Sequence, residues 1–368
     1  MKQPASDAGP FDLGVEEEYH VVDPHTWELR SKIHPILELD MENGVEDVRA
    51  EFLQSQVEAV TRICANVQEV RAEVERMRQD AHHLARDLGM AIMAAGTHPF
   101  SPWPEQEVTQ GERYAILAHE LQDVGRRLIA CGLHIHVGIR DPDLRILVMN
   151  QMRPFLPFLL ALSTSSPFLE GRFTGLHSYR SILLAALPRS GTPPRFDSWD
   201  DYQRTMERLL RERILDGPSF VWWDARPSSR YPTLEIRSPD MPTRIEETVC
   251  IVAWIQALAV KLTRDPFPYH LHRFVIEASK WQAVRYGLDA RIVLPTDESA
   301  RGVREWVGIL LDWLADVAEE LDSRQEMAYA HTIASGGTSA DRQIQVWHET
   351  RDVRAVAAHL VQETEQGL

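Results

Sequence analysis

Two glutamates, Glu16 and Glu18, stand one residue apart in the segment Gly14-Val15-Glu16-Glu17-Glu18. In a β-strand, side chains two residues apart project from the same face, so both carboxylates would point the same way. Carboxylates packed together repel each other, and burying them is costly unless cations or basic side chains compensate. Hard oxygen ligands of this kind suit Mg²⁺ or Mn²⁺. A solvated acidic strand edge is the alternative that this motif alone leaves open.

Two histidines with the same spacing, His134 and His136, lie in the largely apolar stretch 129–139. As a strand, this stretch directs both imidazoles to one face, as in half of a zinc site with histidine and carboxylate ligands. Strand histidines also occur as hydrogen-bonded structural pairs. Because no His-Glu-x-x-His pattern occurs, the sequence gives zinc-dependent hydrolysis little support.

An acid and a base share one parity in Thr233-Leu234-Glu235-Ile236-Arg237. On one strand face, Glu235 could bind a metal ion while the planar fork of Arg237 binds a carboxylate or phosphate. The alternative is a cross-strand ion pair, which contributes little at a surface. Three separate predicted strands therefore offer acids or histidines on a single parity.

The loop over residues 165–181 adds two arginines, Arg172 and Arg180, beside hydroxyl groups and glycines. This composition suits the binding of an anion, although many loops share it. The sequence contains neither a Walker loop, Gly-x-x-x-x-Gly-Lys-Ser/Thr, nor a dinucleotide fingerprint. If ATP binds, metal ions and arginines must hold its phosphates.

The composition, 44% hydrophobic and 26% charged, is typical of a globular protein. The formal net charge of -16 argues against a nucleic-acid partner, which needs a basic face to neutralise phosphates. An anionic small molecule remains compatible with this charge, because a divalent cation reverses the local sign of a site.

Targeting signals and cysteine pairs are missing from the sequence. Residues 1–10 lack the order of a signal peptide, and the apolar run 155–162 is too short to cross a bilayer. The three cysteines lie far apart without a Cys-x-x-Cys pattern, which predicts buried free thiols. We therefore expect a cytoplasmic protein without a membrane partner.

Periodicity predicts one domain over residues 11–368, with strands and helices intermixed, after a disordered segment over residues 1–10. Segment 51–62 is compatible with a strand or a helix start, and segment 165–181 with a loop. Asp141 is a plausible N-cap with Pro142 at the first helical position, and Thr243-Arg244-Ile245-Glu246 resembles a capping box. The expected strands are 11–23, 26–31, 90–95, 129–139, 220–226 and 233–238, and the expected helices are 67–88, 112–128, 198–215 and 244–264.

Six motifs occur in a fixed order along nearly the whole chain. They are Gly14-Val15-Glu16-Glu17-Glu18-Tyr19, Ala95-Gly96-Thr97-His98-Pro99-Phe100, Cys131-Gly132-Leu133-His134-Ile135-His136-Val137-Gly138, Trp222-Trp223-Asp224-Ala225-Arg226-Pro227, Thr233-Leu234-Glu235-Ile236-Arg237 and Trp281-Gln282-Ala283-Val284-Arg285-Tyr286-Gly287-Leu288. This set resembles the carboxylate–amine ligases of the second glutamate–cysteine ligase type, the YbdK-like family.

The resemblance implies an α+β, glutamine-synthetase-like fold, in which a curved antiparallel sheet forms a funnel backed by helices. It also implies ATP, Mg²⁺ (Mn²⁺ as an alternative) and amide formation through an acyl phosphate. Glutamate and cysteine are the default substrates, and another acyl donor is the alternative. The expected partners are a small carboxylate and a small amine, and a homo-oligomer is compatible with the sequence.

The same resemblance implies roles for particular residues. Arg237 and Glu16 are expected to be catalytic, with Arg237 as a phosphate clamp. In a regular strand Glu51 would have the opposite parity to Glu58, so sharing a site would require a bulge. The expected metal ligands are Glu16, Glu18, Glu51, Glu58, His134 and Glu235. The expected nucleotide- and substrate-binding residues are His134, Arg237, Arg172, Tyr179, Arg180 and Arg342.

The C-terminal segment 336–343 departs from the family pattern, which is usually more basic. Arg342 is retained, while Ile344 stands where a second arginine is common. If this segment closes over the site, substrate specificity would change with it.

Two other functions are compatible with the individual motifs. A metal-dependent amidohydrolase would use the histidines and glutamates to cleave amides without ATP and would favour Zn²⁺. A nucleotide sensor would bind ATP without turnover. The sequence singles out no general base for an incoming amine.

Overall fold

The computed structural model describes residues 11–43, 48–297, 299–366 and 368. The predicted disordered segment over residues 1–10 lies outside these described residues.

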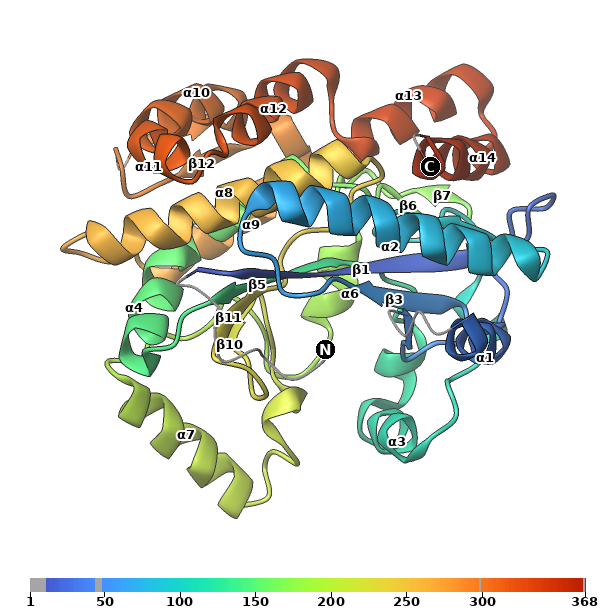
Figure 1. Cartoon of the computed structure of the whole chain (residues 1–368), viewed down its shortest axis with the longest axis horizontal. Helices are drawn as coiled ribbons and strands as arrows, with labels where there is room; N and C mark the ends of the chain where they lie inside the picture. Colours follow the sequence, from blue (N-terminus) through green and yellow to red (C-terminus); the bar gives the residue numbers. More distant parts are fainter. Residues whose placement is uncertain (1–10, 44–47, 298, 367) are drawn as a thin grey trace.

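A seven-stranded antiparallel sheet forms the centre of the structure (Figure 1). Its strands run in the order β10-β11-β5-β1-β3-β2, and β4 extends the sheet by pairing with the end of β1. β1 is the longest strand, and it pairs with β3 along one edge and with β5 and then β4 along the other. The strands are β1 (Leu13–Val22), β2 (Val48–Ala50), β3 (Gln56–Val60), β4 (Ala91–Met93), β5 (Leu133–Gly138), β10 (Ala225–Pro227) and β11 (Thr233–Ile236).

Three small two-stranded sheets lie outside the central one. They are β6 (Phe168–Leu169) with β7 (Arg172–Phe173), β8 (Ser190–Gly191) with β9 (Trp222–Trp223), and β12 (Arg291–Val293) with β13 (Ala300–Gly302).

Helices cover one face of the central sheet, and α2 and α8 lie directly against it (Figure 1). Most of α8 is buried, whereas α2 buries only one side, as an amphipathic surface helix does. The α-helices are α1 (Ile33–Asn43), α2 (Val67–Asp87), α3 (Glu112–Arg126), α4 (Pro142–Met152), α5 (Leu156–Ser163), α6 (Arg180–Ala185), α7 (Trp199–Arg211), α8 (Ile245–Arg264), α9 (Arg273–Tyr286), α10 (Val303–Trp313), α11 (Ala315–Glu320), α12 (Arg324–Gly336), α13 (Ser339–Thr350) and α14 (Val353–Thr364). Single 3₁₀ turns are η1 (Trp103–Glu105), η2 (Arg153–Phe155), η3 (Pro218–Phe220) and η4 (Gly287–Asp289).

On the opposite side of the sheet, α3 and α7 stand apart from each other at the two ends of the sheet (Figure 1). The large helical layer therefore covers only one face. On the other face lie the side chains of every second residue of each strand, those that point away from α2 and α8.

The continuous stretch Pro142–Ser163, which forms α4, η2 and α5, is long and apolar enough to cross a membrane. In its most apolar window of 18 residues, 94% of the residues are buried within the protein, so its apolar character is explained by core packing. The stretch includes the shorter apolar run 155–162.

β1 has acidic side chains on both faces of the sheet, and one of them, Glu17, faces the helices. Glu17 lies on the same face as Val15 and Tyr19 and is fully buried. Arg78 of α2 donates to its carboxylate at 2.6 and 3.2 Å, and Thr248 of α8 donates at 2.7 Å. The buried charge thus ties both core helices to the central strand.

Several predicted elements differ from the structure. Segment 26–31 forms a single bridge, Val22 to Leu29, and no strand, while segment 165–181 contains the hairpin β6–β7. α8 has Arg244 as its N-cap, one residue later than the predicted Thr243. Thr243 instead uses its hydroxyl to bind the carbonyl of Ala94 at 3.0 Å, whereas the Arg244 amide donates to Glu247.

We predict that Arg78→Met lowers the free energy of unfolding by about 3–5 kcal/mol, because it leaves the Glu17 carboxylate buried without its cation. Denaturant unfolding followed by circular dichroism measures this change. Arg86→Met, on the exposed end of the same helix, is the matched control and should shift stability by less than about 0.5 kcal/mol. Equal effects of the two variants would contradict the assigned role of the buried pair.

Candidate active site

A cavity of about 620 Å³ opens over the sheet face that α2 and α8 do not cover. Side chains from β1, β2, β3, β5, β10 and β11 form its floor, and α3 and the segment around α6 contribute to its walls. The acids and histidines in its lining are Glu16, Glu18, Glu51, Glu58, Glu235, His134 and His136, and the arginines are Arg49, Arg113, Arg180, Arg226, Arg230 and Arg237.

The strand register brings the acids of β1 and β3 together. Glu18 lies directly opposite Glu58, and Glu58 in turn lies opposite Arg49 of β2. Directly opposite residues in an antiparallel pair have their side chains side by side, and like charges there are destabilising. The Glu18–Glu58 pair is therefore an arrangement that requires a compensating positive charge.

The register on the other edge of β1 adds the histidines. Glu16 lies opposite His134 of β5, and Glu235 of β11 lies opposite His136. Both histidines and Glu235 are buried. As the two-residue spacing predicts, Glu16 and Glu18 share one face of β1, and His134 and His136 share one face of β5. The two histidines lie between the acids of β1 and the acid of β11.

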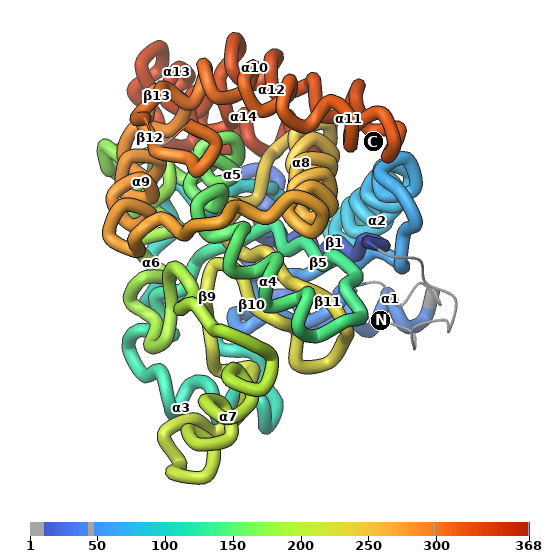
Figure 2. The backbone as a smooth tube through the Cα atoms, turned by 90° about the vertical axis from the view of Figure 1, so that its left-hand side faces the viewer, coloured from blue at the N-terminus to red at the C-terminus, as the bar shows by residue number. Residues whose placement is uncertain are grey.

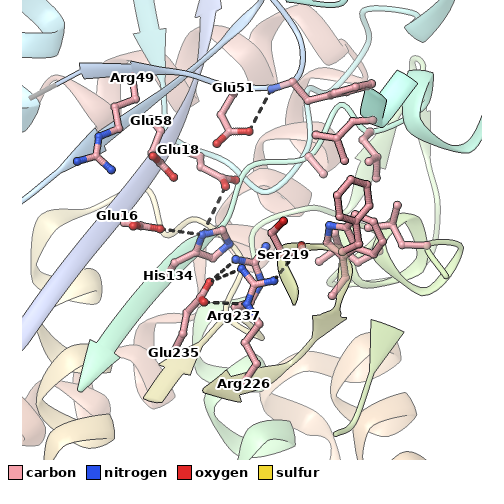
Figure 3. A pocket seen from close by; sticks show the side chains of 18 of the residues that line it. Glu16, Glu18, Arg49, Glu51, Glu58, His134, Ser219, Arg226, Glu235 and Arg237 are labelled. Atoms are coloured by element: carbon pink, nitrogen blue, oxygen red, sulfur yellow. Dashed lines mark hydrogen bonds and ion pairs between the residues drawn. The ribbon is translucent and has the colours of Figure 1, made fainter. Parts of the chain in front are cut away.

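Glu51 reaches the same cluster from outside the strands. It follows β2 directly, and its carbonyl accepts a hydrogen bond from the hydroxyl of Thr109 at 2.6 Å. The bulge expected from parity is not needed, because Glu51 and Glu58 belong to different segments of the β2–β3 hairpin. Figure 3 shows Glu51, Glu18 and Glu58 directed toward a shared space.

Among the described residues, three groups of acids and histidines place their ligand atoms within 4.8 Å of one another. These groups are Glu16 with His136 and Glu235, Glu16 with Glu58 and His134, and Glu18 with Glu51 and Glu58. Carboxylate oxygens dominate all three, which is the donor set that Mg²⁺ or Mn²⁺ prefers.

The Nδ1 atom of His134 gives an independent sign that a cation fits this cluster. It is buried and has no hydrogen-bond partner in the described part of the chain. It stands 3.5 Å from a Glu16 oxygen and 3.6 Å from a Glu18 oxygen, too far for good hydrogen bonds. A buried polar atom without a partner is costly, and a shared metal ion would satisfy all three groups.

Electrostatics divide the carboxylates into two sets. Burial, and then the neighbouring Glu51 charge, raise the pKa of Glu18 to about 8. Burial, followed by Glu16 and Glu51, raises the pKa of Glu58 well above its ordinary value. Burial also raises the pKa of Glu51. Without cations, this set resists full ionisation.

The second set is already compensated. Burial would raise the pKa of Glu16, but the neighbouring His134 and His136 outweigh it and hold that pKa well below its ordinary value. Burial and the charge of Arg237 lower the pKa of His134 to about 4, so this imidazole is neutral at pH 7. A neutral imidazole is the form that binds a metal ion.

Glu235 is held between two arginines. Arg226 donates to its carboxylate at 2.8 and 3.1 Å, and Arg237 donates to one of the same oxygens. Although burial alone would raise the pKa of Glu235, the two guanidinium groups keep it below its ordinary range. The cross-strand ion pair considered from the sequence forms between Glu235 and Arg226, but it lies with Arg237 in the cavity wall and not at the outer surface (Figure 3).

The side chain of Arg180 packs directly over Gly132 and lines the cavity. Its guanidinium donates to the carbonyls of Arg237 at 3.2 Å and Ser238 at 3.4 Å and stands 3.8 Å from Asp240. A Cβ built on Gly132 would lie 2.0 Å from an Arg180 nitrogen, so any side chain there would displace the arginine. The amide of Gly132 also donates to Glu18 at 2.5 Å.

Three of the expected binding residues, Arg172, Tyr179 and Arg342, are not part of the described cavity lining. Arg172 is exposed on the small hairpin β6–β7. Arg342 pairs with Glu247 at 2.7 Å and with Glu363 at 2.9 Å in the helical layer. The C-terminal segment 336–343 likewise does not contribute to the described cavity lining.

The sequence predicts His136 as a member of the histidine pair but not as a metal ligand. It predicts no role for Arg226, Arg49 or Arg113, which line the cavity. The parity of His136 with His134 was a usable signal. Arg226 follows from the β10–β11 register, where it lies opposite Glu235, and that register is not visible in a single sequence.

Comparison with known proteins agrees with this geometry. The family model for glutamate–cysteine ligase family 2 (GCS2) matches residues 12–359. The chain belongs to this family. It is 43% identical to the Roseiflexus sp. (strain RS-1) protein named "Putative glutamate--cysteine ligase 2", with 99% of this chain and 97% of that protein covered. A Solibacter usitatus protein of the same name is 40% identical over 97% of this chain and 94% of its own length.

Solved structures with the same fold are more distant in sequence. The glutamate–cysteine ligase of Francisella tularensis, solved in complex with AMP, superposes with a TM-score of 0.71 at 13% identity, covering 98% of this chain and 90% of its own. A bifunctional glutathione synthetase from Pasteurella multocida has the same TM-score at 14% identity, covering 96% of this chain and 52% of its own. The predicted α+β fold, built on an antiparallel sheet with helices against it, is confirmed, and it is the fold of these two ligases.

We predict that, with a chelator present, stability falls as the pH rises between 4.5, the ordinary pKa of Glu18, and about 8, its pKa in the fold. In this window the folded protein retains a proton that the unfolded chain has released, so each such group costs up to about 1.4 kcal/mol per pH unit. Denaturant unfolding at several pH values in EDTA measures the slope. Mg²⁺ should restore stability, and more so at pH 8 than at pH 5.5.

The variant Glu18→Gln isolates this contribution, because its amide oxygen can still accept from Gly132. Its unfolding free energy in EDTA should depend less steeply on pH than that of the wild type. Parallel slopes for the two proteins would contradict the predicted proton uptake at Glu18.

Proposed function

We propose that this protein is an ATP-dependent carboxylate–amine ligase that forms an amide through an acyl phosphate. The observation that carries the proposal is the cluster Glu16, Glu18, Glu51 and Glu58, whose carboxylates share one cavity with the arginines around Glu235. Membership of the glutamate–cysteine ligase family 2 supports the same class of reaction. A protein of the same fold has been solved with AMP, which agrees with a nucleotide in this cavity.

The chemistry requires activation of the carboxylate, because its own leaving group would be an oxide. A carboxylate oxygen attacks the γ-phosphorus of ATP, the bond to the bridging oxygen breaks, and ADP leaves. The amine nitrogen then attacks the acyl carbon, inorganic phosphate departs, and the nitrogen loses a proton. Positioning and charge neutralisation supply most of the catalysis of the phosphoryl transfer.

The residues present fit divalent cations, with Mg²⁺ as the proposed ion and Mn²⁺ as the alternative. Glu16, Glu18, Glu51, Glu58, His134 and Glu235 would hold them, and His136 joins this set because it groups with Glu16 and Glu235. When bound, such ions neutralise phosphate charge and fix the phosphate oxygens. They would also counter the burial, and the repulsion between neighbouring carboxylates, that raise the pKa values of Glu18 and Glu58.

The arginines of the cavity would take the place of a Walker loop. Arg237 is fixed in direction by Glu235 and therefore presents its remaining donors to the cavity without a large loss of side-chain entropy. Arg180 is fixed by backbone carbonyls from 237 and 238. Donors that are already oriented stabilise charge that develops on a transferring phosphoryl group.

Glutamate and cysteine are the proposed default substrates, because the names of the relatives indicate that pair. No cavity contact identifies the side chain of the acyl donor or that of the amine. Another acyl donor would change the name of the reaction and leave the mechanism as it stands.

We predict that purified protein with ATP and Mg²⁺ releases ADP only when a carboxylate and an amine are both present. A matrix of amino acids and amines, read by ADP release with the product mass confirmed, measures this and identifies the substrates. Release of an amine from an amide without ATP would instead identify an amidohydrolase. ATP binding without turnover across the whole matrix would identify a sensor, and either result would overturn the proposal.

We predict that Arg237→Met lowers kcat/KM for ADP release by about 10²- to 10³-fold, because an oriented donor to the transferring group is lost. Steady-state kinetics measures the effect on the substrate pair that the matrix identifies. Arg324→Met, on an exposed helix start, is the matched control and should retain wild-type kinetics. Comparable activity of Arg237→Met, with its cation-dependent stability intact, would contradict the role of Arg237.

A further inference from the structure

A second and much smaller cavity, of about 10 Å³, lies at the end of α4 and shares no lining residue with the large one. Its wall includes Arg153 in η2, the segment Tyr269–Leu271 between α8 and α9, and Ile276 in the first turns of α9. Figure 2 views the molecule from this side, where the orange segment between α8 and α9 crosses in front of the core.

Arg153 is the unusual group in this cavity. Its side chain is only 5% exposed, and its Nε atom is buried without a hydrogen-bond partner. Within the described part of the chain, no ion pair compensates its guanidinium. A buried and unpaired cation costs several kcal/mol, so such a residue is retained in a fold only where something offsets its charge.

The neighbouring charges offset it only in part. Burial, followed by the charges of Arg273 and Arg195, lowers the pKa of Arg153, and Glu277 counters this lowering without cancelling it. The two nearby acids are already paired, Asp197 with Arg195 at 2.9 Å and Glu277 with Arg273 at 3.4 Å. The two carboxylates pair with Arg195 and Arg273. The buried guanidinium of Arg153 is left without a carboxylate of its own among the described residues.

The polar side chains beside Arg153 are also committed elsewhere. Asn150 binds the carbonyl of Phe196 at 2.7 Å and accepts from its amide. Gln151 makes the same pair of bonds with Phe267, at 3.0 and 3.2 Å. These contacts direct the side-chain amides of Asn150 and Gln151 to backbone groups, and the Arg153 Nε–H has no hydrogen-bond partner within the described part of the chain.

We propose that this cavity is a binding site for a small inorganic anion, held by Arg153 and remote from the ligase site. The volume accommodates about one water-sized atom, which fits a halide or a single oxygen of an oxyanion. His270 lines the mouth, and α9 begins beside it with the positive end of its dipole. A bound anion would pin the α8–α9 connection to the end of α4.

Bromide is the probe for this site, because it is monatomic and visible by anomalous scattering. Crystals of the full chain grown in bromide should show an anomalous peak in hydrogen-bonding contact with Arg153. This test uses wild-type protein and does not depend on the folding of any variant. Absence of a peak at Arg153, with other bromide sites occupied, would overturn the proposal.

In solution, bromide should raise the melting temperature of the wild type in a saturable way. Arg153→Met should bind bromide about tenfold more weakly or worse, because the charged hydrogen bond is lost. Arg324→Met, which changes an exposed arginine, should respond like the wild type. Equal responses of the wild type and Arg153→Met would overturn the proposal, since a general salt effect acts on both.

Sulfate distinguishes the two forms of the ligand. If sulfate saturates the wild-type response at a lower concentration than bromide, and Arg153→Met lacks that response, the site is confirmed with an oxyanion as its ligand. If bromide saturates first with the same dependence on Arg153, the site is confirmed as a halide site.

Discussion

The structure depends on the two-residue period of β1, which sends buried charge to both faces of the central strand. Glu17 faces the helical layer, where Arg78 and Thr248 neutralise it within the protein. Glu16 and Glu18 face the cavity, where the strand opposite adds another acid, Glu58. Within the protein, Arg78 and Thr248 compensate the charge of Glu17. The cavity-facing carboxylates, in contrast, need a bound cation for full compensation.

This difference explains how the sheet serves as a platform. Contacts among β1, α2 and α8 are internally compensated, so the floor of the cavity is fixed before any ligand binds. The acids above it are placed by register and remain close together because the strands leave them no freedom to separate. Rigid placement of repelling groups favours the binding of cations over rearrangement of the side chains.

Much of this arrangement was predictable from the sequence. The parity of Glu16 with Glu18, of His134 with His136 and of Glu235 with Arg237 placed each pair on one face, and the family motifs joined the pairs into one site. Glu51 is expected in the cluster from the family resemblance, with a bulge as the condition, and the structure places it beside Glu18 and Glu58 without one. Periodicity cannot show that the chain turns between Glu51 and β3. Arg172 and Arg342 are expected at the site from the family resemblance, but Arg172 lies exposed on the β6–β7 hairpin, and Arg342 pairs with Glu247 of α8 and Glu363 of α14.

The close packing of Arg180 on Gly132 has a consequence for mutational scanning of this protein. Gly132 has no side chain and contributes its backbone amide as a donor to Glu18, yet every substitution there would displace the Arg180 guanidinium that lies over it. Screens for lost activity would therefore score Gly132 together with Arg180, as though it were itself a reactive group. The absence of a side chain at Gly132 is therefore required for the site, because it leaves the space that the Arg180 guanidinium occupies.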